Sequence, residues 1–128
     1  MADQSDVRCI ALALPQTSEA DSQFSFAVAN KGKQKKFVWA WNERVDPKKP
    51  RVPRADVVAV RVIDLAEKEA LLASDERKFF TEPHYDGFRA VLVRLAEIDV
   101  SELEELIVDA WRCQAPRELA EVLQWKEP

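Results

Sequence analysis

One histidine lies in the stretch of this sequence that is best supplied with groups for chemistry. His84 stands beside Tyr85, which is the one tyrosine of the chain, and Glu82 and Asp86 are close by. An imidazole titrates near neutral pH, so His84 could act as a general acid or base. A general base needs a substrate pocket and an orienting partner, and a single histidine gives zinc no second imidazole ligand. We therefore favour the alternative that His84 and Tyr85 form hydrogen bonds that hold this loop against a sheet.

Basic side chains are concentrated in the second quarter of the chain. Residues 31–61 carry a net charge of +7 and the remainder carries −11, within an overall charge of −4. Grouped lysines and arginines neutralise phosphates, so this region is the candidate DNA-binding surface. The expected contacts lie on a hairpin tip and on the loop after it: Lys31, Lys33, Lys35, Lys36, Lys48, Lys49, Arg51 and Arg54. The same polarised charge would suit an acidic protein partner or self-association, and an ordinary solvated loop is the third alternative.

Two tryptophans follow the lysines on one expected strand. Alternation places Phe37, Trp39 and Trp41 on a single face. Exposed tryptophans on a sheet stack unpaired bases in proteins that bind single strands. Large aromatic residues at alternate strand positions are more often core, and this is the interpretation we favour here.

The sequence lacks the common catalytic and cofactor motifs. Its two glycines are isolated, so no Gly-rich phosphate loop can form, and neither GxSxG nor HExxH occurs. Cys9 and Cys113 have no CxxC spacing and no histidine neighbour, which favours two reduced thiols packed in helices. We expect no enzymatic activity, no metal and no cofactor. A small-molecule binder centred on His84 remains an alternative, and it requires a pocket lined by Trp or Phe.

Length and composition fit one folded domain. The 128 residues are 47% apolar and 33% charged, which excludes wholesale disorder. We expect a single domain over residues 1–128, with a basic, Pro-rich loop at 43–54. The chain has no apolar run of membrane-spanning length, and its first residues are acidic where a signal peptide is basic. The expected location is therefore cytoplasmic, without a membrane partner.

Hydrophobic periodicity predicts the helices. Apolar residues at positions 7, 10, 11 and 14 predict a first helix that ends at Pro15. A short helix should follow Asp64, with Leu65, Leu71 and Leu72 as its anchors. A capping box at Ser101 should begin a long helix with a stripe at 103, 106, 107, 110 and 111, and a last helix follows Pro116.

Alternation and valine content predict the strands. Residues 24–41 should form a hairpin that turns at 30–33, and 56–63 and 89–95 should form two further strands. The resulting order is α, β, β, β, α, β, α, α. This order predicts an α+β fold, an antiparallel sheet with the N- and C-terminal helices packed on one face.

Four segments carry a family resemblance: ALALPQTSEADSQFSF, KFVWAW, FFTEPHYDGFRAVLVRL and ELEELIVDAWRCQAP. Their most specific piece is Pro83-His84-Tyr85, between a Phe-containing stretch and an apolar strand. In these segments the chain resembles the MmcQ/YjbR-like family of small bacterial proteins. The resemblance implies an α/β fold with a double-wing architecture and, from that shape, DNA binding. It implies no catalytic residue in this chain.

Overall fold

A mixed sheet-and-helix architecture is seen in the computed structural model, which describes residues 2–43, 48 and 52–122. The strands are β1 Thr17–Glu19, β2 Ser25–Asn30, β3 Lys33–Glu43, β4 Val52–Arg61, β5 Phe79–Phe80 and β6 Ala90–Arg94. The α-helices are α1 Gln4–Leu12, α2 Leu65–Ser74, α3 Val100–Gln114 and α4 Arg117–Val122. Two 3₁₀ turns, η1 Pro83–Tyr85 and η2 Leu95–Glu97, flank β6. Among the described helices, none is long and apolar enough to cross a membrane.

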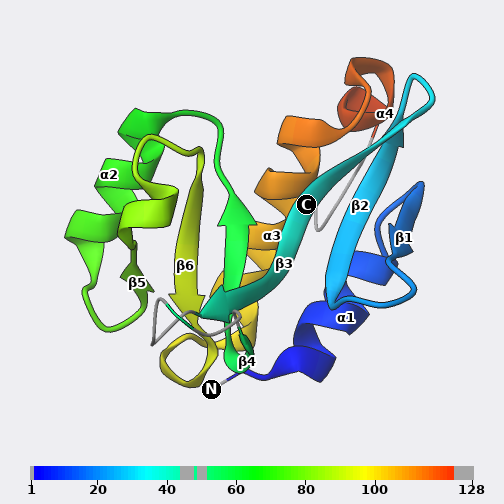
Figure 1. Ribbon diagram of the computed structural model, residues 1–128. Coiled ribbons are helices and arrows are strands. Elements are labelled where there is room, and N and C mark those ends of the chain that lie inside the picture. The colour runs from blue at the N-terminus through cyan, green and yellow to red at the C-terminus, as the bar shows by residue number, and fades with distance from the viewer. Residues whose placement is uncertain (1, 44–47, 49–51, 123–128) are drawn as a thin grey trace.

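All six strands belong to one antiparallel sheet in the order β1-β2-β3-β4-β6-β5. The helices α1 and α3 cover one face of this sheet, and α2 lies beside β5 and β6 (Figure 1). The predicted α+β fold, with an antiparallel sheet covered by N- and C-terminal helices, is confirmed. The short edge strands β1 and β5 were not predicted, because two or three residues carry no usable alternation.

The main core lies between the sheet and its two covering helices. Trp111 of α3 is fully buried there with Phe26 of β2 and Val58 of β4. Its indole Nε1 donates a hydrogen bond to the carbonyl oxygen of Pro15 at 3.0 Å, which ties α3 to the end of the first helical segment. The predicted helical stripes face this core, so they determine which side of each helix meets the sheet.

A β-bulge in β3 changes the predicted face of one aromatic residue. The pairing of β2 with β3 shifts between Phe26 and Ala27, so one residue of β3 is extra at that point. As a result Phe37 packs in the helix-side core, whereas Trp39 and Trp41 face the opposite side. The prediction that all three share one face is therefore wrong for Phe37.

The face opposite the helices carries a second, smaller core. Its buried members are Trp41, Val57, Ala59, Tyr85, Ala90 and Leu92, and Trp39 and Phe80 pack against them. The 3₁₀ turn η1 places Tyr85 over this face. Both faces of the central strands are therefore covered, which accounts for the run of four buried residues from Val57 to Val60.

Strand β4 begins earlier than the valine pattern predicts. The expected start was residue 56, after a Pro-rich loop at 43–54, but β4 begins at Val52, inside that predicted loop, and pairs with β3 there. Strand β6 pairs only with Val57 to Arg61. Within the described residues, the first half of β4 has a strand on one side only, and a proline such as Pro53 is tolerated in that position.

Aspartates cap α1, α2 and α3. Asp3 forms a capping box with Asp6, and Asp64 accepts a hydrogen bond from the Glu67 amide at 2.8 Å. The long helix α3 is capped by Asp99, whose side chain accepts from the amide of Glu102 at 2.8 Å. The predicted cap at Ser101 is therefore wrong, since the helix begins before it.

Candidate ligand-binding cleft

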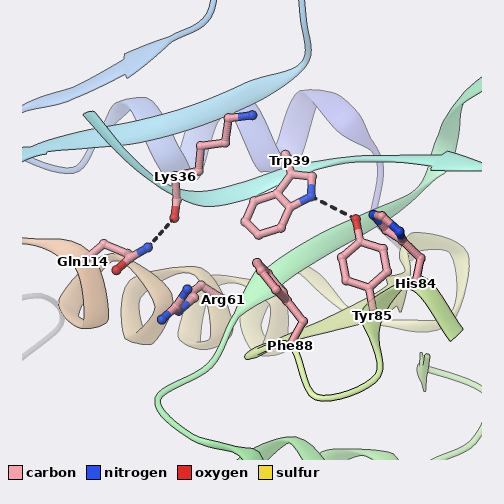
Figure 2. Close-up of a pocket in the computed structure, with 7 residues that line it drawn as sticks. All are labelled: Lys36, Trp39, Arg61, His84, Tyr85, Phe88 and Gln114. Carbon is pink, nitrogen blue, oxygen red and sulfur yellow. Dashed lines mark hydrogen bonds between the residues drawn. The ribbon is translucent and has the colours of Figure 1, made fainter. Parts of the chain in front are cut away.

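A cleft of about 320 Å³ opens on the second face of the sheet. Figure 2 shows its lining, which comes from four separate segments: Lys36, Trp39, Arg61, His84, Tyr85, Phe88 and Gln114. The two β3 residues and Arg61 of β4 come from the sheet, and Gln114 is the last residue of α3. The turn η1 and the residues after it provide the rest. The volume is at the small end of the range for ligand sites.

Three aromatic rings form one wall of the cleft. The indole Nε1 of Trp39 donates a hydrogen bond to the Tyr85 hydroxyl at 3.1 Å. The rings of Trp39 and Phe88 meet edge to face, with centroids 6.3 Å apart, and those of Tyr85 and Phe88 do the same at 5.9 Å. The quadrupoles of aromatic rings favour such edge-to-face contacts, which stabilise this arrangement. Phe88 is nevertheless 45% exposed, so part of the wall is open to a ligand.

A buried lysine holds this wall in place. Lys68 of α2 is only 4% exposed, and its Nζ donates hydrogen bonds to the carbonyl oxygens of Tyr85 at 2.5 Å and Phe88 at 3.0 Å. Burial lowers the pKa of Lys68, and the charge of Asp86 partly opposes that shift. Gly87 lies between the two carbonyls with φ of +75°, a conformation that glycine adopts without strain.

The sequence carries a signal for the buried position of Lys68, which was not among the predicted site residues. Lys68 follows Leu65 by three positions and precedes Leu71 and Leu72 by three and four, so it lies on the same helical stripe. A charged residue within an apolar stripe is buried only when it has partners. Leu65, predicted as an anchor of that stripe, is instead 43% exposed, so the lysine takes the inward position.

The opposite wall of the cleft is polar. Gln114 donates from Nε2 to the carbonyl oxygen of Lys36 at 2.8 Å, and Asn30 donates from Nδ2 to the carbonyl oxygen of Gln114 at 2.9 Å. These two bonds fix the end of α3 against the β2–β3 hairpin. The Nε atom of Arg61 is buried without a hydrogen-bond partner in the described part of the chain. Of the lining residues none is acidic.

Comparison with known proteins identifies the family. The family model YjbR matches residues 12–113, which is most of the chain. The chain belongs to the YjbR family. The resemblance seen in the PH-aromatic segment and the C-terminal helix is thereby confirmed.

Relatives of this YjbR protein carry no stated function. Uncharacterized proteins Mb2600 of Mycobacterium bovis and Rv2570 of Mycobacterium tuberculosis are each 55% identical to it over 69 residues. The match covers 54% of this chain and 54% of each relative, so this chain spans about half the length of the curated relatives it matches. A crystal structure of Deinococcus radiodurans protein DR2400, with domain DUF419, matches with a TM-score of 0.63 at 18% identity. That match covers 88% of this chain and 78% of the other, and it shows a shared fold.

Two of the four aromatic and imidazole residues selected from the sequence form the centre of the cleft wall. Trp39 and Tyr85 are joined by the indole–hydroxyl bond described above. His84 is exposed at the end of the cleft, where its ring meets that of Tyr85 edge to face at 5.4 Å. Trp41 is 7% exposed and packs against Phe80 at 5.3 Å, so its ring faces the second core and not the cleft.

The basic residues selected from the sequence lie at two ends of β3. Lys31, Lys33, Lys35 and Lys36 are all exposed on or next to the β2–β3 turn. Arg54 lies near the start of β4, beside the other end of β3, and forms an ion pair with Asp56 at 2.9 Å. Lys36 and Arg54 both line a second cleft beside β3. Lys48 is exposed, and Lys49 and Arg51 lie outside the described residues. Lys31, Lys33 and Lys35 therefore lie apart from Arg54 at the hairpin, whereas Lys36 also lines the cleft with the aromatic wall.

The two thiols are free and lie on different helices. Cys9 of α1 is exposed, and Cys113 of α3 is partly buried. Burial raises the pKa of the Cys113 thiol, although the positive charge of Arg61 opposes that shift. In the described ranges, no three His, Cys, Asp or Glu residues are grouped closely enough to hold a metal ion.

Proposed function

We propose that this YjbR protein is a non-enzymatic binding protein whose ligand is a small molecule with a flat ring. The observation that carries the proposal is the fixed aromatic wall of Trp39, Tyr85 and Phe88. Its rings are oriented by one another, by the indole–hydroxyl bond and by Lys68 beneath them. A site arranged before the ligand arrives loses little entropy on binding.

A binding role suits the cleft better than catalysis does. His84 is the one imidazole among the lining residues, and histidine is the side chain most often used as a general acid or base. In the described part of the chain, the contact found for its imidazole is the ring of Tyr85, and no carboxylate lines the cleft to orient it. A general base requires such a partner. The lining of the cleft therefore supports the non-enzymatic half of the proposal.

Ligand-observed NMR tests the proposal directly. Saturation transfer would be measured from the protein to a panel of flat-ring compounds, including nucleosides, nucleoside monophosphates and aromatic carboxylates. The matched variants are Phe88→Ala, which truncates the exposed part of the wall, and Ile63→Ala, a 66% exposed apolar residue outside the cleft lining. We expect transfer to at least one compound class, lost in Phe88→Ala and kept in Ile63→Ala. Transfer to no compound, or transfer that Phe88→Ala leaves unchanged, would refute the proposal.

Nucleic-acid binding is the second candidate, and the hairpin lysines favour it. Four exposed lysines lie within six residues of one another, and no ion pair is found for them within the described residues. Lys36 also borders Trp39, so a single strand could place phosphates on the hairpin and a base in the cleft. Such binding weakens steeply with salt because phosphate contacts release counterions.

Fluorescence anisotropy with duplex and single-stranded DNA, at low and moderate salt, tests this candidate. The variant changes Lys31, Lys33, Lys35 and Lys36 to Glu, and the control changes the exposed Arg77 and Arg89 to Glu. Salt-sensitive binding that only the hairpin variant loses would support a nucleic-acid surface. Binding that is independent of salt, or equally weakened by both variants, would reject it. Competition by polyglutamate would instead favour an acidic protein partner on the same lysines.

A further inference from the structure

We infer that the ligand of the cleft is an anion, and that Arg61 binds its anionic group. The chemical class is a flat ring that carries one phosphate or carboxylate, as in a nucleoside monophosphate or an aromatic carboxylate. This inference rests on the proposed function and adds to it the charge of the ligand and the residue that recognises it.

Arg61 reaches the cleft because of its position on β4. Side chains alternate along a strand, so Arg61 shares a face with Ala59 and Val57 of the second core. It is the last residue of β4 and pairs with Ala90. Figure 2 shows its guanidinium between Gln114 and Phe88, at the junction of the polar and aromatic walls. The anion-binding group and the stacking surface are therefore neighbours.

The hydrogen bonding of Arg61 is incomplete. Its Nε is buried, and it has no acceptor among the described residues. A buried donor without an acceptor is unfavourable, and an oxyanion supplies acceptors for several guanidinium donors at once. A planar guanidinium binds carboxylate or phosphate oxygens in pairs.

The charge of the lining agrees with an anionic ligand. The chain as a whole is negative, yet the cleft is lined by two cationic side chains, Lys36 and Arg61, and by no acidic one. Figure 2 shows the Lys36 ammonium pointing away from Arg61, so Arg61 is the cation placed to contact the ligand. Lys36 adds to the positive potential that attracts an anion.

The arrangement also limits where the ring can lie. Trp39 and Phe88 are in edge-to-face contact, so no ring can insert between them. The open space lies between this pair and the Arg61–Gln114 side (Figure 2). A ring stacked there would have its substituent beside Arg61. The Gln114 side-chain amide, which Lys36 holds through its carbonyl oxygen, can accept a hydrogen bond from the ring through Oε1.

Matched neutral and anionic ligands test the inference by isothermal titration calorimetry. The pairs are adenosine with adenosine monophosphate, and 4-hydroxybenzyl alcohol with 4-hydroxybenzoate. The variants are Arg61→Gln, Arg61→Lys and, as a control, Arg112→Gln on the exposed side of α3. Thermal melts of each variant show whether it is folded at the titration temperature.

We expect the anionic member of at least one pair to bind about tenfold or more tightly than its neutral partner. Arg61→Gln should remove that advantage and leave the neutral member unchanged, Arg61→Lys should retain part of it, and Arg112→Gln should retain it all. The pair that shows the advantage identifies phosphate or carboxylate as the group. Equal binding of neutral and anionic members would overturn this inference while the proposed function stands, and binding of no member would overturn both.

Discussion

Replacing Lys68 with methionine tests how the aromatic wall is supported. The substitution keeps an unbranched side chain of similar length and removes the ammonium that bonds the carbonyls of Tyr85 and Phe88. Each hydrogen bond from a charged donor contributes about 1.5–3 kcal/mol to stability. Burying an ammonium costs several kcal/mol, on the order of half the combined contribution of the two hydrogen bonds or more. Methionine avoids this desolvation cost. We therefore expect the free energy of unfolding to fall by about 2 kcal/mol, a large effect for one substitution.

Urea unfolding measures this loss, and hydrogen exchange locates it. With an m-value of about 2 kcal/mol per molar urea, the midpoint should fall by about 1 M. Amide exchange should accelerate chiefly in residues 82–89, because the loop loses its support while the helix-side core remains. The control is Lys78→Met. Lys78 forms an ion pair with Glu102, and its side chain is 27% exposed, so this variant should lose less stability than Lys68→Met.

The contribution of Lys68 should also depend on pH. Burial lowers its pKa from the ordinary value of 10.5, so over the range between the folded-state pKa and 10.5 the unfolded chain binds more protons. The contribution of Lys68 to the free energy of unfolding is therefore largest above that pH range and decreases as the pH falls through it. The neutral amine still has two N–H donors for the two carbonyl oxygens. The stability difference between wild type and Lys68→Met should grow from neutral to alkaline pH. A variant as stable as wild type, with unchanged exchange in residues 82–89, would refute this account of the wall.

Three further predictions concern single residues outside the ring contacts. Asp99→Ala should lower the free energy of unfolding by about 1 kcal/mol, measured in urea, because it removes the α3 cap. Ser101→Ala should change it by less than about 0.5 kcal/mol, and a larger loss in Ser101→Ala than in Asp99→Ala would favour the cap predicted at Ser101. Gly87→Ala meets open space but positive φ, so it should cost about 1–2 kcal/mol, and a neutral result would mean that the turn readjusts. Iodoacetamide should modify Cys9 before Cys113, as followed by mass spectrometry. The modification rate of Cys113 should keep rising with pH above the ordinary thiol pKa of 9.0, and a rate that levels off below that pH would contradict the raised pKa.

Much of the fold could be predicted because local patterns decide it. Val7, Ile10 and Ala11 are buried as the helical period requires, and so are Leu103 and Ile107 of α3. An apolar stripe of this kind has one stable arrangement, which is against another apolar surface. The sheet order was not predictable in the same way, because strand pairing depends on contacts between distant segments.

The cleft could not be predicted from the sequence as a whole site. Its lining is drawn from four segments, and the tertiary fold brings β3, β4, the η1 region and the end of α3 together. The bulge in β3 was equally hidden, since one extra residue leaves the composition of the strand unchanged while it moves Phe37 to the other face. Arg61 belonged to the basic region in sequence, but nothing local distinguished it from the exposed lysines. Arg61 differs from those lysines because its guanidinium Nε is buried.

The two candidate functions share one residue, so the binding of their ligands can be compared directly. Lys36 belongs to the exposed hairpin lysines and to the lining of the cleft. If one ligand used both surfaces, its ring would lie on the aromatic wall, one phosphate would meet Arg61, and further phosphates would follow the hairpin. Linked contacts of this kind multiply affinity, so a short single strand would bind more tightly than a mononucleotide, and only the additional affinity would depend on Lys31, Lys33 and Lys35. An aromatic carboxylate has no such extension, and its affinity would be indifferent to the hairpin. The dependence on these three lysines therefore separates a strand-binding protein from a small-molecule carrier, even though both use the same wall and the same arginine.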